Sequence, residues 1–205
     1  MRLIAKMAAV AGICAAATGC AQQTPKIEAA TVEKYFKSAF AKVPQGWEAR
    51  VNQDETQRIC TEYRNNPPLA EFNKILAREK LSVVFPADGK VMGNWRGGVT
   101  VAQVGRGGQF SDEPGTVSGG NCYACHQLSK AEVSFGTLGP SLLNYGRDRK
   151  FNPEEAKNTY TKIFNSNAVV PCSNMPRFGY HKVLTEQQMK DVVAYLFDPD
   201  SPVNK

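Results

Sequence analysis

The sequence predicts an all-α protein with long loops and a helical extension at its N-terminal end. Apolar residues recur at helical spacing in several segments, capping signals mark the helix starts, and no segment shows convincing strand alternation. The 205 residues are 42% hydrophobic and 9% aromatic, which is ordinary for a globular protein and argues against disorder. Long loops are uncommon in a compact domain, so we expect its core to hold more than side chains.

Three helices are expected in the extension, residues 22–90. The first covers 27–43 and stops before Pro44-Gln45-Gly46. The second contains Ile59 and is ended by Pro67-Pro68, and the third begins directly after it, at Leu69.

Capping signals predict three further helices in the main domain, residues 91–205. Asn94 is a suitable N-cap, and Asn152 is followed by proline and two glutamates. Thr185 with Gln188 three residues on forms a capping box. The expected helices run over about 95–105, 153–164 and 185–197.

Residues 1–21 have the pattern of an export signal. Arg2 and Lys6 precede an apolar run, 7–17, that is too short to span a bilayer. Small residues follow, so cleavage could fall anywhere over 17–21. Alternatively, Thr18-Gly19-Cys20 resembles a lipoprotein signal, in which Cys20 becomes the lipidated first residue. Both outcomes lead to an oxidising compartment, the periplasm, with a membrane anchor only in the second.

The formal charge of +6 arises from basic residues that are scattered along the chain. This distribution argues against a nucleic-acid interface. It fits either plain solubility or docking to an acidic partner.

The six cysteines divide by location. Two lie in or beside the export signal, and two form a C-x-x-C. We expect the remaining pair, Cys60 and Cys172, to form a disulfide, because leftover cysteines of exported proteins usually pair. Two separate buried thiols are the alternative.

Cys122-Tyr123-Ala124-Cys125-His126 fits the C-x-x-C-H pattern of covalent haem attachment. The two thiols can add to the two vinyl groups of one porphyrin, and His126 can give an imidazole nitrogen to the iron. A zinc site would need a second ligand pair, and a thioredoxin-like site would need an α/β pattern; neither is present. The sequence therefore predicts one covalently bound haem c. Pro140 could hold the other ring nitrogen of His126 through its carbonyl, or could belong to an ordinary turn.

The second axial ligand is predicted by elimination. Met175 lies in an irregular segment directly before a proline, well downstream of the motif. Met92 precedes the motif, and Met189 falls in the last helix, where methionine is usually core filler. We assign Met175, with His181 as the second candidate. Met/His ligation raises the reduction potential and leaves no open position on iron, which suits electron transfer.

Several motifs together resemble a known family. The C-x-x-C-H motif, the following Gly139-Pro140 and the later Met175-Pro176 are similar to the class I cytochrome c pattern. Longer stretches between about residues 92 and 204 are similar to the SoxX cytochromes, the small subunit of the SoxAX complexes of bacterial thiosulfate oxidation. These stretches are 103–107, 120–126, 136–142, 172–179, 184–188 and 191–196.

The resemblance implies a class I cytochrome c fold and a heterodimer with a SoxA-type subunit. In that family SoxA carries the catalytic haem, and the complex joins thiosulfate oxidatively to a cysteine of the carrier protein SoxYZ. The SoxX-like haem passes the electrons to a soluble cytochrome acceptor. The resemblance thus implies covalent haem at Cys122 and Cys125, iron ligands His126 and Met175, and an electron-transfer subunit of an L-cysteine S-thiosulfotransferase complex that is not catalytic alone.

Two other functions remain open. A free-standing electron carrier, shuttling alone or tethered through Cys20, has the same haem motif. A peroxidase or gas sensor would need an open iron position, which ligation by Met175 would close.

Overall fold

The computed structural model describes residues 26–42, 51–109, 111–113 and 115–205. The expected export signal and the two fates of Cys20 lie outside these residues. Within them the regular elements are α-helices and short 3-10 helices, with no strand, so the all-α prediction is confirmed. None of the helices in this part of the chain is long and apolar enough to cross a membrane.

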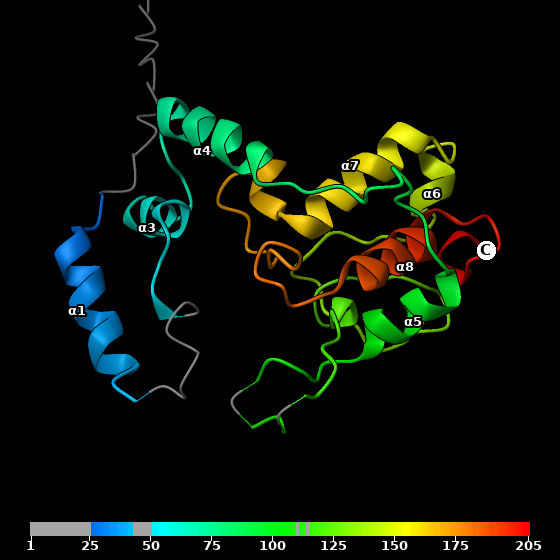
Figure 1. Cartoon of the computed structure of the whole chain (residues 1–205), viewed down its shortest axis with the longest axis horizontal. Helices are drawn as coiled ribbons and strands as arrows, with labels where there is room; N and C mark the ends of the chain where they lie inside the picture. Colours follow the sequence, from blue (N-terminus) through cyan, green and yellow to red (C-terminus); the bar gives the residue numbers. More distant parts are fainter. Residues whose placement is uncertain (1–25, 43–50, 110, 114) are drawn as a thin grey trace, which may run out of the picture.

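The extension consists of α1 (Ala29–Ala39), α3 (Glu55–Glu62) and α4 (Leu69–Leu81). Figure 1 shows α1 and α3 at one end of the molecule, with α4 leading toward the main domain. Helix α1 is shorter than the predicted 27–43: it begins after Glu28, without a side-chain cap, and ends at Ala39.

A capping box at Asp54 starts α3: the Asp54 carboxylate accepts from the backbone N–H of Gln57, and the Gln57 side chain accepts from the backbone N–H of Asp54. This box was not part of the prediction. It defines where the second helix begins, and it places Asp54 beside the main domain.

The main domain contains α5 (Trp95–Gln103), α6 (Tyr145–Asp148), α7 (Pro153–Phe164) and α8 (Glu186–Phe197). The predicted caps of α5, α7 and α8 are formed by Asn94, Asn152 and Thr185, each accepting a backbone N–H of the first turn. Three 3-10 helices complete the domain: η1 (Cys122–Ala124), η2 (Ser166–Ala168) and η3 (Pro202–Asn204). Neither these short elements nor α6 was predicted.

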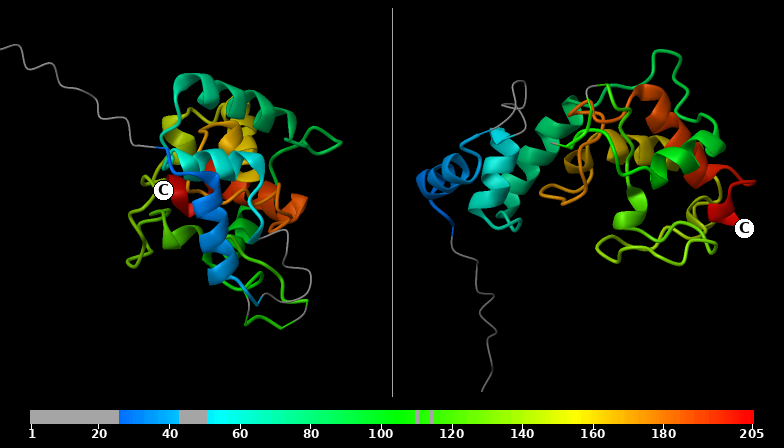
Figure 2. Two further views of the ribbon diagram at one scale, coloured as in Figure 1. Left: turned by 90° about the vertical axis from the view of Figure 1, so that its left-hand side faces the viewer. Right: turned by 90° about the horizontal axis from the view of Figure 1, so that it is seen from below.

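Helices α5 and α8 pack directly on each other and carry the main core. Gly98 of α5 meets the backbone oxygen of Asp191 and the Cβ of Tyr195, both on α8, so a side chain at 98 would collide with α8. The core around this crossing is apolar: Ala102, Tyr160, Val193, Tyr195, Leu196 and Val203 are almost completely buried. Figure 2 shows α5 and α8 at the opposite end of the molecule from α1.

A second, smaller core joins the extension to the main domain. It contains Ile75 of α4, which is fully buried, with Cys60 of α3 and Cys172 of the main domain. Cys60 and Cys172 form a disulfide across 112 residues of chain.

Candidate haem site

The C-x-x-C-H motif folds into a single tight turn, η1. The backbone N–H groups of Cys125 and His126 both donate to the carbonyl of Cys122, at 3.1 and 2.8 Å. Asn121, just before the turn, has a left-handed φ of 45°, a conformation that asparagine tolerates better than most residues. The turn therefore presents the two cysteines and the histidine together.

Cys122 and Cys125 are both free thiols and half-buried. Burial raises the pKa of the Cys122 thiol to about 12, so it stays protonated at neutral pH. No cluster of three or more His, Cys, Asp or Glu side chains that could hold a metal ion occurs among the described residues.

The His126 ring is oriented by the loop that follows the motif. Its Nδ1 lies 2.7 Å from the carbonyl oxygen of Pro140, which accepts the ring N–H and leaves Nε2 as the basic nitrogen. Of the two roles considered for Pro140, the structure therefore shows the first: its carbonyl accepts a hydrogen bond from the His126 ring. The loop is tied back to the motif by a backbone bond from Gly139 to Cys125 at 2.8 Å.

Gly139 lies against the face of the His126 ring. A Cβ at this position would overlap the imidazole, with Nδ1 only 2.6 Å away, so no larger residue fits while the ring stays in place. The sequence showed the Gly-Pro pair as a turn but did not reveal this contact.

The candidates for the second axial ligand lie in different surroundings. Met175 is half-buried in an irregular segment and packs on the main core, as does Cys122. Met189 is buried in α8 beside Phe164, and Met92 is exposed before α5 begins. His181 is exposed, with its ring edge-on to Tyr180 at 5.1 Å. These surroundings favour Met175.

The main chain of Met175 is held on both sides. The hydroxyl of Ser166, in η2, donates to its carbonyl at 2.5 Å, and its N–H donates to the hydroxyl of Ser173 at 3.2 Å. Ser166 is fully buried, so this anchor is shielded from water. The role of Ser166 was not visible in the sequence.

Tyr123, inside the motif, connects the site to the last helix. Its hydroxyl lies 2.6 Å from that of Tyr195 on α8, and both side chains are buried. Burial, together with the bond to Tyr123, raises the pKa of Tyr195 well above its ordinary value. Two buried hydroxyls satisfy each other here and fix the motif to α8.

The residues present fit a covalently bound haem. Two unpaired thiols, one histidine with an oriented ring and a methionine on the same core are the donor set of a c-type cytochrome. Fold and site together define an all-α domain of this class.

Comparisons with known proteins agree with this class. The family model described as Cytochrome c matches residues 111–198. A protein of Aquifex aeolicus (strain VF5), described as "Uncharacterized lipoprotein", is 35% identical over 196 residues, which cover 94% of this chain and 92% of that protein. The chain therefore contains a cytochrome c domain, and its cofactor is haem c.

Proposed function

We propose that this chain is the electron-transfer haem subunit of a periplasmic heterodimeric complex of the SoxAX type. Such a complex couples thiosulfate oxidatively to a cysteine of a SoxYZ-type carrier and passes electrons to a cytochrome acceptor. The proposal is supported by the motifs between residues 92 and 204 that resemble the SoxX cytochromes. The observation that carries the electron-transfer role is the oriented His126, with Nδ1 2.7 Å from the Pro140 carbonyl.

Four residues are assigned to the haem. Cys122 and Cys125 would bind it covalently, and His126 and Met175 would be the two protein ligands of its iron. The bound haem supplies one-electron redox chemistry. The Pro140 carbonyl holds the His126 ring, and Ser166 holds the main chain of Met175, so the fold would present both residues to the haem iron.

The sulfur chemistry is assigned to the partner. With His126 and Met175 both ligating the iron, the haem would offer no site to a substrate. The chain then acts as the electron-transfer subunit of an L-cysteine S-thiosulfotransferase complex, and a SoxA-type cytochrome binds the sulfur substrate.

A second function is favoured by the relative in Aquifex aeolicus, which is described as a lipoprotein and matches almost its whole length to this chain. Thr18-Gly19-Cys20 has the form of a lipidation signal. The alternative is thus an exported, lipid-tethered cytochrome that carries electrons alone.

Isolation of the protein from its native host distinguishes the two functions. Salt and mild detergent washes of membranes, followed by size-exclusion chromatography and intact-mass measurement, report the partner, the haem number and any lipid together. We expect co-elution with a second, larger cytochrome. A protein that elutes alone and carries a diacylglycerol on Cys20 would instead establish the tethered carrier.

A further inference from the structure

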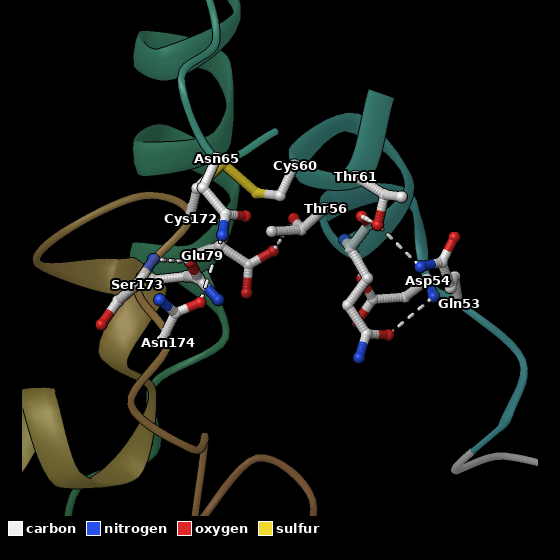
Figure 3. The surroundings of a disulfide bond; sticks show 12 residues. Gln53, Asp54, Thr56, Cys60, Thr61, Asn65, Glu79, Cys172, Ser173 and Asn174 are labelled. Carbon is white, nitrogen blue, oxygen red and sulfur yellow. Dashed lines mark hydrogen bonds between the residues drawn. A yellow bond between two sulfur atoms is a disulfide. The ribbon is translucent and has the colours of Figure 1, made fainter. Parts of the chain in front are cut away.

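The N-terminal extension is fastened to the segment that contains Met175. The first fastening is the disulfide from Cys60 of α3 to Cys172, three residues before Met175 (Figure 3). Cys172 has a left-handed φ of 61°, a conformation that costs energy for a residue with a Cβ. The bridge therefore fixes the main chain in a conformation that it would otherwise leave readily.

The second fastening is Arg177, two residues after Met175 and only 4% exposed. Its guanidinium donates to the carboxylate of Asp54 at 2.5 Å and lies 3.5 Å from the carboxylate of Glu79. Asp54 caps α3 and Glu79 lies on α4, so one side chain contacts two of the three helices of the extension. The guanidinium also lies over the ring of Tyr180, 4.4 Å from its centre.

Glu79 is the centre of this polar cluster and is almost completely buried. One oxygen accepts from the hydroxyl of Thr56, and the other accepts from the side-chain amide of Asn165 at 2.7 Å. Asn165 directly precedes Ser166, whose hydroxyl holds the Met175 carbonyl. The cluster thus reaches the Met175 segment from both sides, through Asn165 and through Arg177.

Buried ion pairs contribute little net stability, because desolvation offsets their attraction. Their value lies in geometry: a buried carboxylate with Thr56, Asn165 and Arg177 around it tolerates few other arrangements. An apolar contact between the extension and the main domain would hold the two together without fixing the position of Arg177 to this degree.

We propose that the extension is a positioning device for the distal haem ligand, and that Arg177 and the Cys60–Cys172 bridge are its two positioning elements. The inference rests on the proposed function in one respect, the assignment of Met175 as ligand. A tethered segment loses less conformational entropy when the thioether binds iron, so tethering strengthens the bond. Loosening either fastening should let the thioether leave the iron more often.

The test uses the ferric holoprotein with imidazole as a competing ligand. Imidazole binds only where Met175 has left the iron, so its apparent affinity reports the population of the open state. The two clamp variants are the double change Cys60→Ala/Cys172→Ala, which leaves no lone thiol, and the double change Arg177→Met/Glu79→Gln, which removes both charges of the most deeply buried pair. We expect apparent imidazole affinity to rise about tenfold or more in each.

Arg149→Gln is the matched control. Arg149 also pairs with a carboxylate, that of Glu155 at 3.8 Å, and its guanidinium lies over the ring of Tyr145. It belongs to the α6 region and does not contact the extension network. Its removal should leave imidazole affinity within about twofold of wild type.

Met175→Ala separates failure of this inference from failure of the ligand assignment. If Met175 is the ligand, this variant binds imidazole more tightly than any clamp variant. Wild-type affinity in Met175→Ala would refute the assignment. Tight binding in Met175→Ala with wild-type affinity in both clamp variants would refute the positioning role alone.

Should the variants not fold, reduction and alkylation of the wild-type holoprotein opens the bridge in folded protein; unchanged affinity there would refute the role of the bridge.

Discussion

His126 shows how far the role of one residue depends on the backbone around it. The motif predicted the histidine as a haem ligand, but its orientation comes from the Pro140 carbonyl and from the absence of a side chain at Gly139. A carbonyl acceptor raises the basicity of the ligating nitrogen. The orientation of the His126 ring is therefore set by two residues, of which the sequence analysis named Pro140 as a candidate acceptor and Gly139 only as part of a turn.

The first prediction concerns Met175. Thioether ligation to ferric haem gives a weak charge-transfer band in the far red, so this band should be present in the wild type and absent in Met175→Ala. The variant should also have a lower reduction potential, because it lacks the soft thioether ligand, which favours ferrous iron. Absorption spectroscopy and redox titration measure both effects.

Three control variants accompany that measurement. Met92→Leu, Met189→Leu and His181→Ala should all keep the band, because Met92 is exposed, Met189 fills the core and His181 contacts Tyr180. Loss of the band in one of these, with its persistence in Met175→Ala, would assign the ligand elsewhere.

Tyr160 provides a prediction for the pH dependence of stability. Burial, with a smaller effect of Glu186, raises the pKa of its hydroxyl to about 12 in the folded protein, against about 10 in the unfolded chain. Below pH 10 both states keep the proton. Above it the unfolded state releases its proton first, so the free energy of unfolding falls as the pH rises toward 12.

The variant Tyr160→Phe removes this contribution. Denaturant titrations at pH 9 and pH 12 measure the free energy of unfolding of both proteins. Between these pH values the variant should lose less of it than the wild type, by on the order of 1 kcal/mol. An equal loss in both proteins would show that Tyr160 titrates normally.

Elements with a chemical start signal were predictable from the sequence. Asn94, Asn152 and Thr185 each cap the expected helix, because a side-chain acceptor before an apolar pattern satisfies an otherwise unpaired N–H. The short element α6 was not predictable. It is held by contacts distant in sequence, such as the side chain of Asn204 accepting from the N–H groups of Gly146 and Arg147.

The crossing of α5 and α8 depends on one glycine. A Cβ at Gly98 would collide with the backbone oxygen of Asp191, which cannot move without displacing α8. We expect Gly98→Ala to lower the free energy of unfolding by about 2–4 kcal/mol, despite the better helix propensity of alanine.

Gly97→Ala is its matched control in the same helix. There the new Cβ would meet the carboxylate of Asp191, 2.6 Å away, and a side-chain end can turn aside. With the gain in helix propensity, its net effect should stay within about 1 kcal/mol. Thermal and denaturant unfolding measure both variants; equal losses would mean that the backbone contact at Gly98 does not limit the crossing.

At the scale of the whole molecule, the sequence indicated an extension and a main domain but not how they are joined. The disulfide could be expected from cysteine location alone. The Glu79–Arg177 pair could not, since a glutamate on a helix is normally solvated. One signal was available: Glu79 follows Ile75 by four residues and so shares its buried face, where a charge needs a partner.

The segments flanking the motif are irregular, and several of their apolar side chains are exposed: Val117, Val133 and Leu138 are 74%, 90% and 78% exposed. Long irregular segments of this kind are uncommon in a compact domain unless they serve a bound group or another function. The haem is therefore expected to be part of the core that makes this domain stable.

The last prediction follows from that dependence. Wild-type protein should carry one haem that survives denaturation and acid–acetone extraction, visible as added mass on the polypeptide. Cys122→Ser should retain haem through one thioether, and Cys122→Ser/Cys125→Ser should yield no stable holoprotein. The double variant should also lose far-UV helical signal and become sensitive to protease in the 115–145 region, while the bridge between Cys60 and Cys172 still forms. Recovery of free haem from the wild type by simple extraction would overturn covalent attachment. A double variant as helical and protease-resistant as the wild type would show instead that the loops fold without haem.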